Sequence, residues 1–215
     1  MGIYLTTAFI FDFDGTLVDS EKAIYRCFQS ITKQLAPERI EYIKNIHIGP
    51  PLHETVSEIL GPEHHDSLDK FVKLFIKMHD EEVLNHTNPY PNVVETLNFM
   101  YKNKIPMALA TNKRRAPTEI IIQSLGWKKF FEIIKCSDDA MIKNKTDSIN
   151  KIILENELFK DSFYVGDTEG DSIAANKNML RFIKTNYGYG RKQEWLDHKI
   201  YAEIACFSEL KFFLK

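Results

Sequence analysis

Short apolar segments alternate with helical patterns along most of this sequence, and this alternation constrains the fold more than any other feature. Nearly all residues of these segments are apolar, which is typical of strands buried on both faces of a sheet. The segments span residues 7–13, 105–111, 131–136, 162–166 and 181–185. Helical patterns cover residues 93–102, 116–125, 146–158 and 171–179. This order predicts an α/β fold in which helices cover both faces of a central parallel sheet.

Residues 18–85 break the alternation, because they contain only helical patterns and no expected strand. Apolar residues recur there at spacings of three and four, as in Ile24, Cys27, Phe28, Ile31 and Leu35 and again in Leu68, Phe71, Val72, Phe75 and Met78. A strand-to-helix connection usually takes ~2–6 residues. We therefore expect residues 18–85 to form an inserted all-α domain, and residues 1–17 and 86–215 to form the α/β domain.

Composition restricts the partners that this chain can have. The 28 basic and 30 acidic residues give a net charge of −2, so there is no basic excess to hold a nucleic acid. No apolar run is long enough to predict a membrane span, and no basic segment precedes the first apolar stretch. The cysteines at positions 27, 136 and 206 form no close pair, which indicates free thiols in a reducing compartment. We predict a cytoplasmic protein that binds neither nucleic acid nor membrane.

Two aspartates end the first apolar segment, in the sequence FIFDFDGTL. Side chains along a strand have a period of two, so Asp12 and Asp14 lie on one face. The carboxyl ends of strands in an open α/β sheet are where ligands bind. Two carboxylates this close repel each other unless a cation or a shared proton relieves them. The pair therefore predicts a hard divalent metal, Mg²⁺ above all, and Gly15 permits the tight turn that follows.

A second acidic pattern, GDTEGD, ends the segment at residues 162–166. Asp167 lies at the carboxyl end of this expected strand. A helix that begins near Gly170 would turn Asp171 back toward the same place. Aspartates also cap helices, so this pattern alone has a structural explanation. Together with Asp12, however, it supplies a further carboxylate for a metal at the same edge of the sheet.

A phosphoryl group at this edge would need donors and a cation beside the carboxylates. The segment at residues 105–111 ends in Thr111 and Asn112, where a hydroxyl and backbone amides can hold phosphate oxygens. Lys143 and Lys145 lie directly before the helical pattern that begins at Thr146. Taken singly, the threonine is a turn signal and each lysine is an ordinary surface residue.

These motifs resemble those of the haloacid-dehalogenase-like hydrolases, in particular the phosphoglycolate-phosphatase-like branch with a helical cap. The first, second and fourth family motifs correspond to FIFDFDGTLVDS at 9–20, MALATN at 107–112 and YVGDTEGD at 164–171. Softer matches are IGPPLHE at 48–54, YPNV at 90–93 and YGYG at 187–190. The resemblance covers essentially the whole chain. It implies a Rossmann-like three-layer core and makes residues 18–85 the cap.

The resemblance also implies the catalytic roles. Asp12 would be the nucleophile that forms an aspartyl-phosphate, and Asp14 would protonate the leaving group and then activate water. Thr111 and Asn112 would bind the phosphoryl group of a small phosphate ester. Lys145 would neutralise that group. Dehalogenating members lack an acid at the position of Asp14, so the chain is predicted to act on phosphate esters.

The resemblance further implies a Mg²⁺ ion held by Asp12, the main-chain carbonyl of Asp14 and Asp167, with Asp171 close by. The third motif departs from the usual pattern, and Lys143 is an alternative to Lys145. His53 stands where related caps often carry arginine, so it is a candidate substrate-binding residue. We expect it to bind an anionic group less strongly than arginine would. Arg26, Lys44 and Arg114 are possible substitutes for that arginine.

Three functions remain open at this point. The first is a Mg²⁺-dependent phosphatase for a small soluble phosphomonoester, acting as a monomer or homodimer. The second is a phosphomutase of the β-phosphoglucomutase kind, which shares nearly the same motifs. The third is a non-catalytic binding module that keeps the fold.

Overall fold

A computed structural model describes residues 7–192, 195 and 199–214 of the 215-residue chain. Its centre is a six-stranded sheet in the order β5-β4-β1-β6-β7-β8, and every pairing within it is parallel. The strands are β1 (Phe9–Phe11), β4 (Met107–Ala110), β5 (Ile133–Lys135), β6 (Phe163–Gly166), β7 (Arg181–Thr185) and β8 (Ala202–Ile204). Strand β1 lies between β4 and β6, so its carboxyl end is at the middle of the sheet.

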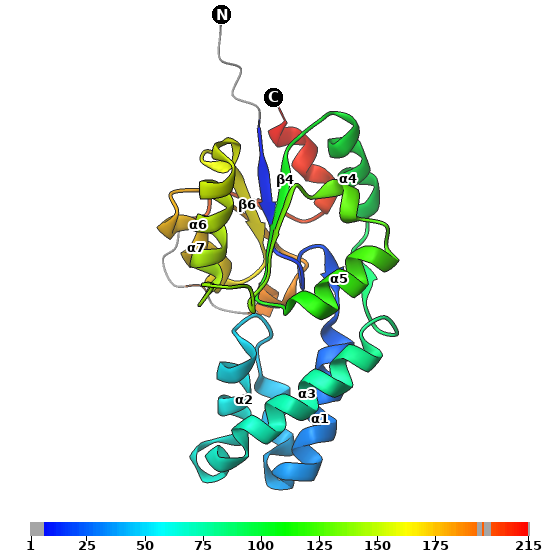
Figure 1. Cartoon of the computed structure of the whole chain (residues 1–215), viewed down its shortest axis with the longest axis vertical. Helices are drawn as coiled ribbons and strands as arrows, with labels where there is room; N and C mark the ends of the chain where they lie inside the picture. Colours follow the sequence, from blue (N-terminus) through cyan, green and yellow to red (C-terminus); the bar gives the residue numbers. More distant parts are fainter. Residues whose placement is uncertain (1–6, 193–194, 196–198, 215) are drawn as a thin grey trace, which may run out of the picture.

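Helices cover both faces of this sheet, as Figure 1 shows. Those at the sides are α4 (Val93–Lys102), α5 (Arg115–Ser124), α6 (Lys145–Glu155) and α7 (Glu169–Lys177). Alternate residues of β1 face opposite layers: Phe9 and Phe11 belong to the hydrophobic cluster that includes α4 and α5, and Ile10 belongs to the cluster of α6 and α7. The α/β fold with a three-layer, Rossmann-like core and a central parallel sheet is therefore confirmed.

Three further helices pack together below the carboxyl edge of the sheet (Figure 1). They are α1 (Glu21–Leu35), α2 (Leu52–Leu60) and α3 (Leu68–Glu82), joined by 3₁₀ segments at Pro37–Asn45 and Pro62–Ser67. Their apolar stripes form a hydrophobic cluster of their own, in which Phe28, Phe71 and Phe75 are buried. Among the residues that the structure describes, Tyr189 is the one buried member of that cluster from outside residues 18–85. We call the α1–α3 assembly the helical unit.

The structure differs from the sequence prediction at the places where this unit meets the sheet domain. Residues Val18–Asp19 form a short strand, β2, which pairs antiparallel with β3 (Asn88–Pro89). The prediction that residues 18–85 contain no strand is therefore wrong at its first two residues. A two-residue strand has no side-chain periodicity to read, because only the tertiary pairing creates it. Strand β8 was also missed, since its three residues carry no apolar run.

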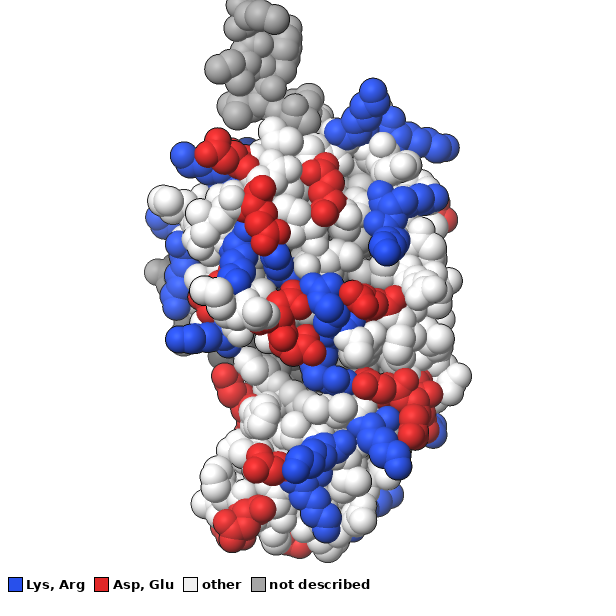
Figure 2. Space-filling model, in the orientation of Figure 1, with Lys and Arg blue, Asp and Glu red and all other residues white. Residues whose placement is uncertain are grey.

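The surface and the cysteines agree with the composition. On the face seen in Figure 2, basic and acidic side chains alternate over both the sheet domain and the helical unit. Cys27, Cys136 and Cys206 are free thiols. Within the described residues, no helix is long and apolar enough to cross a membrane.

Candidate active site

Three neighbouring strands each deliver a polar side chain to the carboxyl edge of the sheet. Asp12 directly follows β1, Thr111 follows β4 and Asp167 follows β6. Because β1 pairs with both other strands, these three positions meet at one place. The chain runs from β1 to one side of the sheet and returns later to the other, and ligands bind at such a switch point.

The turn after β1 requires a glycine. Gly15 has a φ of +85°, a left-handed conformation that side chains disfavour. A Cβ atom at this position would lie 2.4 Å from the Oδ2 atom of Asp167. Gly15 therefore allows the loop of β1 and the loop of β6 to approach each other closely.

A buried lysine joins two of the carboxylates. The Nζ atom of Lys145, the first residue of α6, donates to Asp12 Oδ1 at 2.7 Å and to Asp171 Oδ1 at 2.6 Å. The three side chains are nearly inaccessible to solvent. Because α6 begins at the carboxyl edge of the sheet, its first turn brings the ammonium group to the centre of the site.

Backbone donors and hydroxyl groups fix Asp171 and Asp167. Asp171 closes a capping box at the start of α7, where its Oδ2 accepts from the backbone N–H and the hydroxyl of Thr168. Asp167 Oδ2 accepts from the N–H of Tyr189 at 2.6 Å, and its Oδ1 accepts from Thr16. Asp171 therefore takes part in capping α7, as its sequence pattern allowed, and also contacts Lys145.

Burial and mutual repulsion shift the ionisation of this cluster. Burial raises the pKa of Asp12 well above its ordinary value, and the Asp171 charge adds to this rise. Burial and then Asp171 raise the pKa of Asp167 to about 7. Burial acts to lower the pKa of Lys145, but the charges of Asp12 and Asp171 outweigh it and the pKa is raised. The single ammonium group of Lys145 thus offsets the negative charge of three carboxylates.

These carboxylates suit a divalent cation. Asp12, Asp167 and Asp171 each offer an oxygen, and the three oxygens lie within 4.8 Å of one another. Burial is the main cause of the raised pKa values of Asp12 and Asp167, and the Asp171 charge adds to both. Hard oxygen donors at a site with uncompensated negative charge fit Mg²⁺ or a similar ion. The carboxylate of Asp14 lies outside this group.

Asp14 has partners of its own. Its Oδ1 accepts from the hydroxyl of Ser20 at 2.5 Å, and both its oxygens lie 3.1 Å from the Nζ of Lys113. The Lys113 side chain is only 6% exposed. Sequence reasoning missed this lysine, although it directly follows the predicted phosphate-binding residues Thr111 and Asn112.

The structure separates the two candidate lysines. Lys145 is buried among the aspartates, whereas Lys143 is exposed and its backbone N–H donates to Asp147. The geometry thus favours Lys145 as the cation of the site. Asn144 caps α6 by accepting from the N–H of Asp147, and this cap sets the direction from which Lys145 enters.

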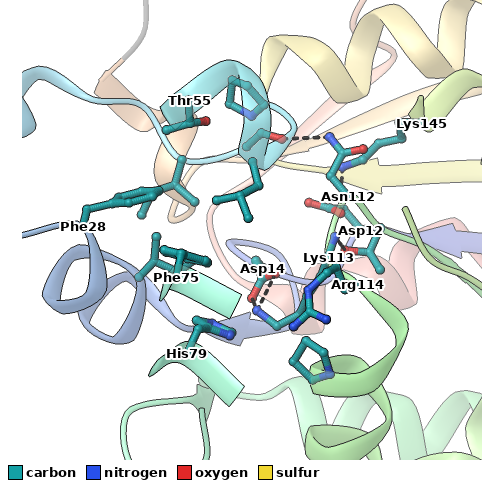
Figure 3. Close-up of a pocket in the computed structure, with 17 residues that line it drawn as sticks. Asp12, Asp14, Phe28, Thr55, Phe75, His79, Asn112, Lys113, Arg114 and Lys145 are labelled. Atoms are coloured by element: carbon teal, nitrogen blue, oxygen red, sulfur yellow. Dashed lines mark hydrogen bonds and ion pairs between the residues drawn. The ribbon is translucent and has the colours of Figure 1, made fainter. Parts of the chain in front are cut away.

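The site opens into a cavity of about 100 Å³ between the sheet domain and the helical unit. The sheet domain contributes Asp12, Asp14, Thr111, Asn112, Lys113, Arg114, Pro117 and Lys145 to its lining. The helical unit and its loops contribute Ile24, Phe28, Ile48, Gly49, Pro50, Leu52, Thr55, Phe75 and His79. Figure 3 shows Phe28, Phe75 and His79 on the side opposite Asp12 and Lys145.

Polar contacts join the helical unit to the sheet domain beside the site. Asn112 Nδ2 donates to the carbonyl oxygen of Gly49 at 2.8 Å. The Arg114 guanidinium donates to both oxygens of Asp80, on α3, at 2.6 and 2.7 Å. Asn112 therefore lies in the cavity wall as expected, but its amide contacts the helical unit.

The expected arginine substitutes do not all reach the site. Of the candidates, Arg114 lines the cavity, whereas Arg26 is exposed and pairs with Glu82, and Lys44 is exposed and pairs with Glu41. His53 is exposed and is absent from the described residues that line the cavity. It lies on α2, whose buried face is turned toward the other helices.

His79 is the residue of the helical unit that sequence reasoning did not find. It lies four residues after Phe75 on the buried face of α3, and the two rings stack with centroids 5.3 Å apart. It is 4% exposed, and its Nε2 atom has no hydrogen-bond partner.

Burial, followed by the charge of Lys113, lowers the pKa of His79 to about 3. The ring is therefore neutral at physiological pH. Its place on the same apolar stripe was the only available signal.

A parallel sheet carries a buried lysine and an acidic cluster at its carboxyl edge, beneath a helical unit, and such a site can bind charged groups. The sequence profile of the family described as haloacid dehalogenase-like hydrolase matches residues 9–185. The chain therefore belongs to the haloacid dehalogenase-like hydrolases, as its motifs indicated.

Two similar proteins are named as phosphatases. Pyrophosphatase PpaX from Listeria monocytogenes serotype 4a (strain HCC23) is 28% identical over 177 residues, which cover 80% of this chain and 79% of the relative. A phosphoglycolate phosphatase from Aquifex aeolicus (strain VF5) is 26% identical over 184 residues, or 84% of each chain. The predicted branch of the family and the predicted phosphatase class of enzyme are confirmed.

A solved structure shows the same fold over the full length. The haloacid dehalogenase-like family hydrolase from Streptococcus pneumoniae superposes with a TM-score of 0.83 at 21% identity. The match covers 98% of this chain and 100% of that one. The helical unit is thus part of the shared architecture.

Proposed function

We propose that this protein is a Mg²⁺-dependent phosphatase that hydrolyses a small phosphomonoester through an aspartyl-phosphate on Asp12. One observation carries the proposal: the buried Lys145 ammonium joins Asp12 to Asp171 beside Asp167, and Asp12 and Lys145 line the cavity. Phosphoryl transfer depends mainly on positioning and charge stabilisation. This site provides a nucleophile, a cation and acidic metal ligands in one place.

The first half-reaction transfers the phosphoryl group to the protein. An Asp12 carboxylate oxygen forms a bond to phosphorus, and the bond from phosphorus to the ester oxygen breaks. The leaving oxygen takes a proton from the Asp14 carboxyl group, so the alcohol departs neutral. Lys145 and the hydroxyl group of Thr111 stabilise the phosphoryl oxygens.

The second half-reaction restores the enzyme. Asp14 accepts a proton from water as the water oxygen bonds to phosphorus, and the bond from phosphorus to Asp12 breaks. Inorganic phosphate leaves, and Asp14 holds a proton again for the next cycle. Ser20 and Lys113 keep the Asp14 carboxyl at the cavity wall, where both steps need it.

Asp12, Asp167 and Asp171 are the residues that would hold the metal, together with the main-chain carbonyl of Asp14. A bound Mg²⁺ supplies positive charge that offsets the repulsion between the carboxylates and the substrate phosphate. The three oxygens within 4.8 Å of one another and the raised pKa values of Asp12 and Asp167 support this assignment.

We also propose that residues 18–85 act as a cap that closes over the substrate. The helical unit has its own hydrophobic cluster, and polar contacts at Asn112 and Arg114 join it to the sheet domain. A unit with a hydrophobic cluster of its own can move as a body, and closure excludes water from the reaction.

The test measures phosphate release from a panel of small phosphate esters in Mg²⁺ or in EDTA, for the wild type and Asp12→Asn. We expect EDTA to remove activity, and Asp12→Asn to lower kcat by at least ~1000-fold. Asp161→Asn is the matched control, because Asp161 is exposed at the opposite end of β6. Activity that survives both EDTA and Asp12→Asn would contradict the mechanism.

The same panel separates the alternative functions. A phosphomutase would isomerise a sugar phosphate with little release of inorganic phosphate. A non-catalytic module would hydrolyse none of the esters. Release of phosphate that depends on Asp12 is the result that distinguishes a phosphatase from both.

A further inference from the structure

The cavity above Asp12 has two chemically different walls. The wall from the sheet domain is polar, with Asp12, Lys113 and Lys145 among its residues. The wall from the helical unit is formed mainly by apolar side chains, which are Ile24, Phe28, Ile48, Leu52 and Phe75. A bound phosphoryl group must lie against the polar wall, so the rest of the ester faces the apolar one (Figure 3).

No cation of the helical unit reaches this cavity within the described residues. The three basic side chains in its lining all come from the sheet domain, and each already contacts a carboxylate. Lys145 contacts Asp12, Lys113 contacts Asp14 and Arg114 contacts Asp80. A second anionic group on the substrate would have to break one of these ion pairs or stay unpaired. An unpaired charge in such surroundings is costly.

The apolar wall contains one polar group without a partner. His79 Nε2 is buried and has no hydrogen-bond partner among the described residues. A buried polar atom without a partner is unfavourable, so a partner supplied by the substrate would be favoured. The ring is neutral at physiological pH, because burial depresses its pKa. It can therefore bond an uncharged hydroxyl or carbonyl group but cannot balance a carboxylate.

The space against the apolar wall is small. The cavity holds about 100 Å³, whereas an apolar cavity of roughly 150 Å³ admits benzene. The cavity is open on one side and shares Gly49, Pro50, Asn112 and Lys145 with a larger neighbouring pocket. Its volume therefore limits only the part of the leaving group that lies against the apolar wall, which is a group of a few non-hydrogen atoms.

We propose that the substrate is a phosphomonoester with a small, uncharged and largely apolar leaving group, which carries at most one polar atom for His79. This proposal rests on the proposed phosphatase function. It sets the chain apart from the relatives whose names specify pyrophosphate or phosphoglycolate, since both of those compounds carry a second anionic group.

The test compares kcat/KM for phosphoglycolate, its methyl ester, propyl phosphate and pyrophosphate. Phosphoglycolate and its methyl ester differ by one methyl group and one charge, so they isolate the effect of charge. We expect the methyl ester and propyl phosphate to exceed phosphoglycolate and pyrophosphate by at least ~10-fold, as expected for a buried charge left without a partner.

Two variants show whether the wall of the helical unit sets this preference. Leu52→Arg places a cation in the wall and should raise relative kcat/KM for phosphoglycolate by ~10-fold or more. Ser57→Arg adds the same charge to an exposed position of α2 outside the cavity, and it should leave the preference unchanged. His79→Leu should raise KM for the methyl ester more than KM for propyl phosphate, with little effect on kcat.

The outcomes separate this inference from the proposed function. Asp12-dependent hydrolysis with phosphoglycolate or pyrophosphate as the preferred substrate would overturn the inference and leave the phosphatase function standing. No hydrolysis of any ester would overturn both. Preference for the uncharged esters in the wild type supports the inference, even if Leu52→Arg fails to fold.

Discussion

At the scale of single residues, each buried charge of the site depends on a small number of hydrogen-bond or ion-pair partners. Lys145 is shared between Asp12 and Asp171, and Asp167 depends on backbone N–H groups. Replacing one partner therefore leaves a buried charge uncompensated, which costs more than the contact itself contributes. His79 is a different case, because it is buried, neutral and unpaired.

Lys145→Met should remove both activity and stability. We expect kcat/KM to fall by at least ~100-fold, because the phosphoryl charge loses its fixed cation. Loss of the ammonium group from the buried cluster should cost about 3–5 kcal/mol in the free energy of unfolding at pH 7. Lys143→Met is the matched control, since Lys143 is exposed. Steady-state kinetics and urea unfolding check both, and a loss confined to Lys143→Met would reverse the assignment.

His79 should make stability depend on pH. Its pKa is about 3 in the folded protein and ~6.5 when unfolded, so below pH 6.5 the unfolded chain binds more protons. The contribution of His79 to stability is therefore lost as the pH falls through this range, and its share between pH 7 and pH 5 should be about 2 kcal/mol. The raised pKa of Asp167 acts in the opposite direction in both the wild type and a His79 variant, so only the difference between the two proteins reports on His79. Asp14, Asp80, Lys113 and Arg114 are the charged groups around the ring.

Urea unfolding of the wild type and His79→Leu at the two pH values measures this effect. The variant lacks the titrating ring, so it should lose about 2 kcal/mol less than the wild type on going from pH 7 to pH 5. Equal losses in the two proteins would show that the ring is protonated in the folded state.

At the scale of elements, strands and helices place the charged side chains of the site, and a loop of the helical unit contacts the sheet domain beside them. The strands bring Asp12, Thr111 and Asp167 to one edge, and the first turns of α6 and α7 add Lys145 and Asp171. The loop that precedes α2 then makes the contact with the sheet domain. Gly49, in this loop, accepts a hydrogen bond from Asn112 and lies against Thr168.

Gly49→Ala should weaken this closed contact. Gly49 has a φ of +136°, and an added Cβ would lie 2.8 Å from the Cγ2 atom of Thr168. We expect kcat/KM to fall by ~10-fold or more, because small displacements at an active site are costly. The double variant Gly49→Ala/Thr168→Ser lacks the crowding methyl group and keeps the capping hydroxyl, so it should recover part of the loss.

Gly126→Ala separates backbone strain from crowding. Gly126 also has a positive φ, of +68°, but no atom lies within 4 Å of the position that its Cβ would take. It should lower stability by about 1–2 kcal/mol without a change in kcat/KM. If Thr168→Ser restores nothing to Gly49→Ala, crowding against Thr168 is not the cause of its defect.

At the scale of the whole molecule, a charged site is buried between two units that each have a hydrophobic cluster. The acidic cluster is in the sheet domain, and the cavity closes only where the helical unit meets it. Metal binding and closure of the helical unit should therefore stabilise the folded chain as a unit.

Mg²⁺ should raise the melting temperature. At about 100 times its Kd, a ligand adds ~2.7 kcal/mol to the free energy of unfolding, which corresponds to ~5–10 °C for a chain of this size. Scanning calorimetry in Mg²⁺ and in EDTA measures the shift. Asp167→Asn should reduce it strongly, and Asp161→Asn should retain it. A shift that persists in Asp167→Asn would place the metal elsewhere.

The sequence by itself determined the fold class and the identity of the acidic residues. Nearly uniform apolar segments predict buried parallel strands. An aspartate that directly follows such a strand must lie at the carboxyl edge of the sheet, because it is adjacent in sequence to the end of the strand. Asp12 and Asp167 followed from this rule, and Asp171 followed from the turn of the helix that begins near Gly170. The cytoplasmic location and the oligomeric state stay predictions.

Only the tertiary structure decided which side chains meet. Lys143 and Lys145 are two residues apart and look alike in sequence, but the start of α6 buries one of them and leaves the other exposed. The ion pair of Lys113 with Asp14 and the place of His79 in the cavity join segments far apart in the chain. Sequence patterns report local periodicity, whereas contacts between two separately packed units depend on how those units close on each other.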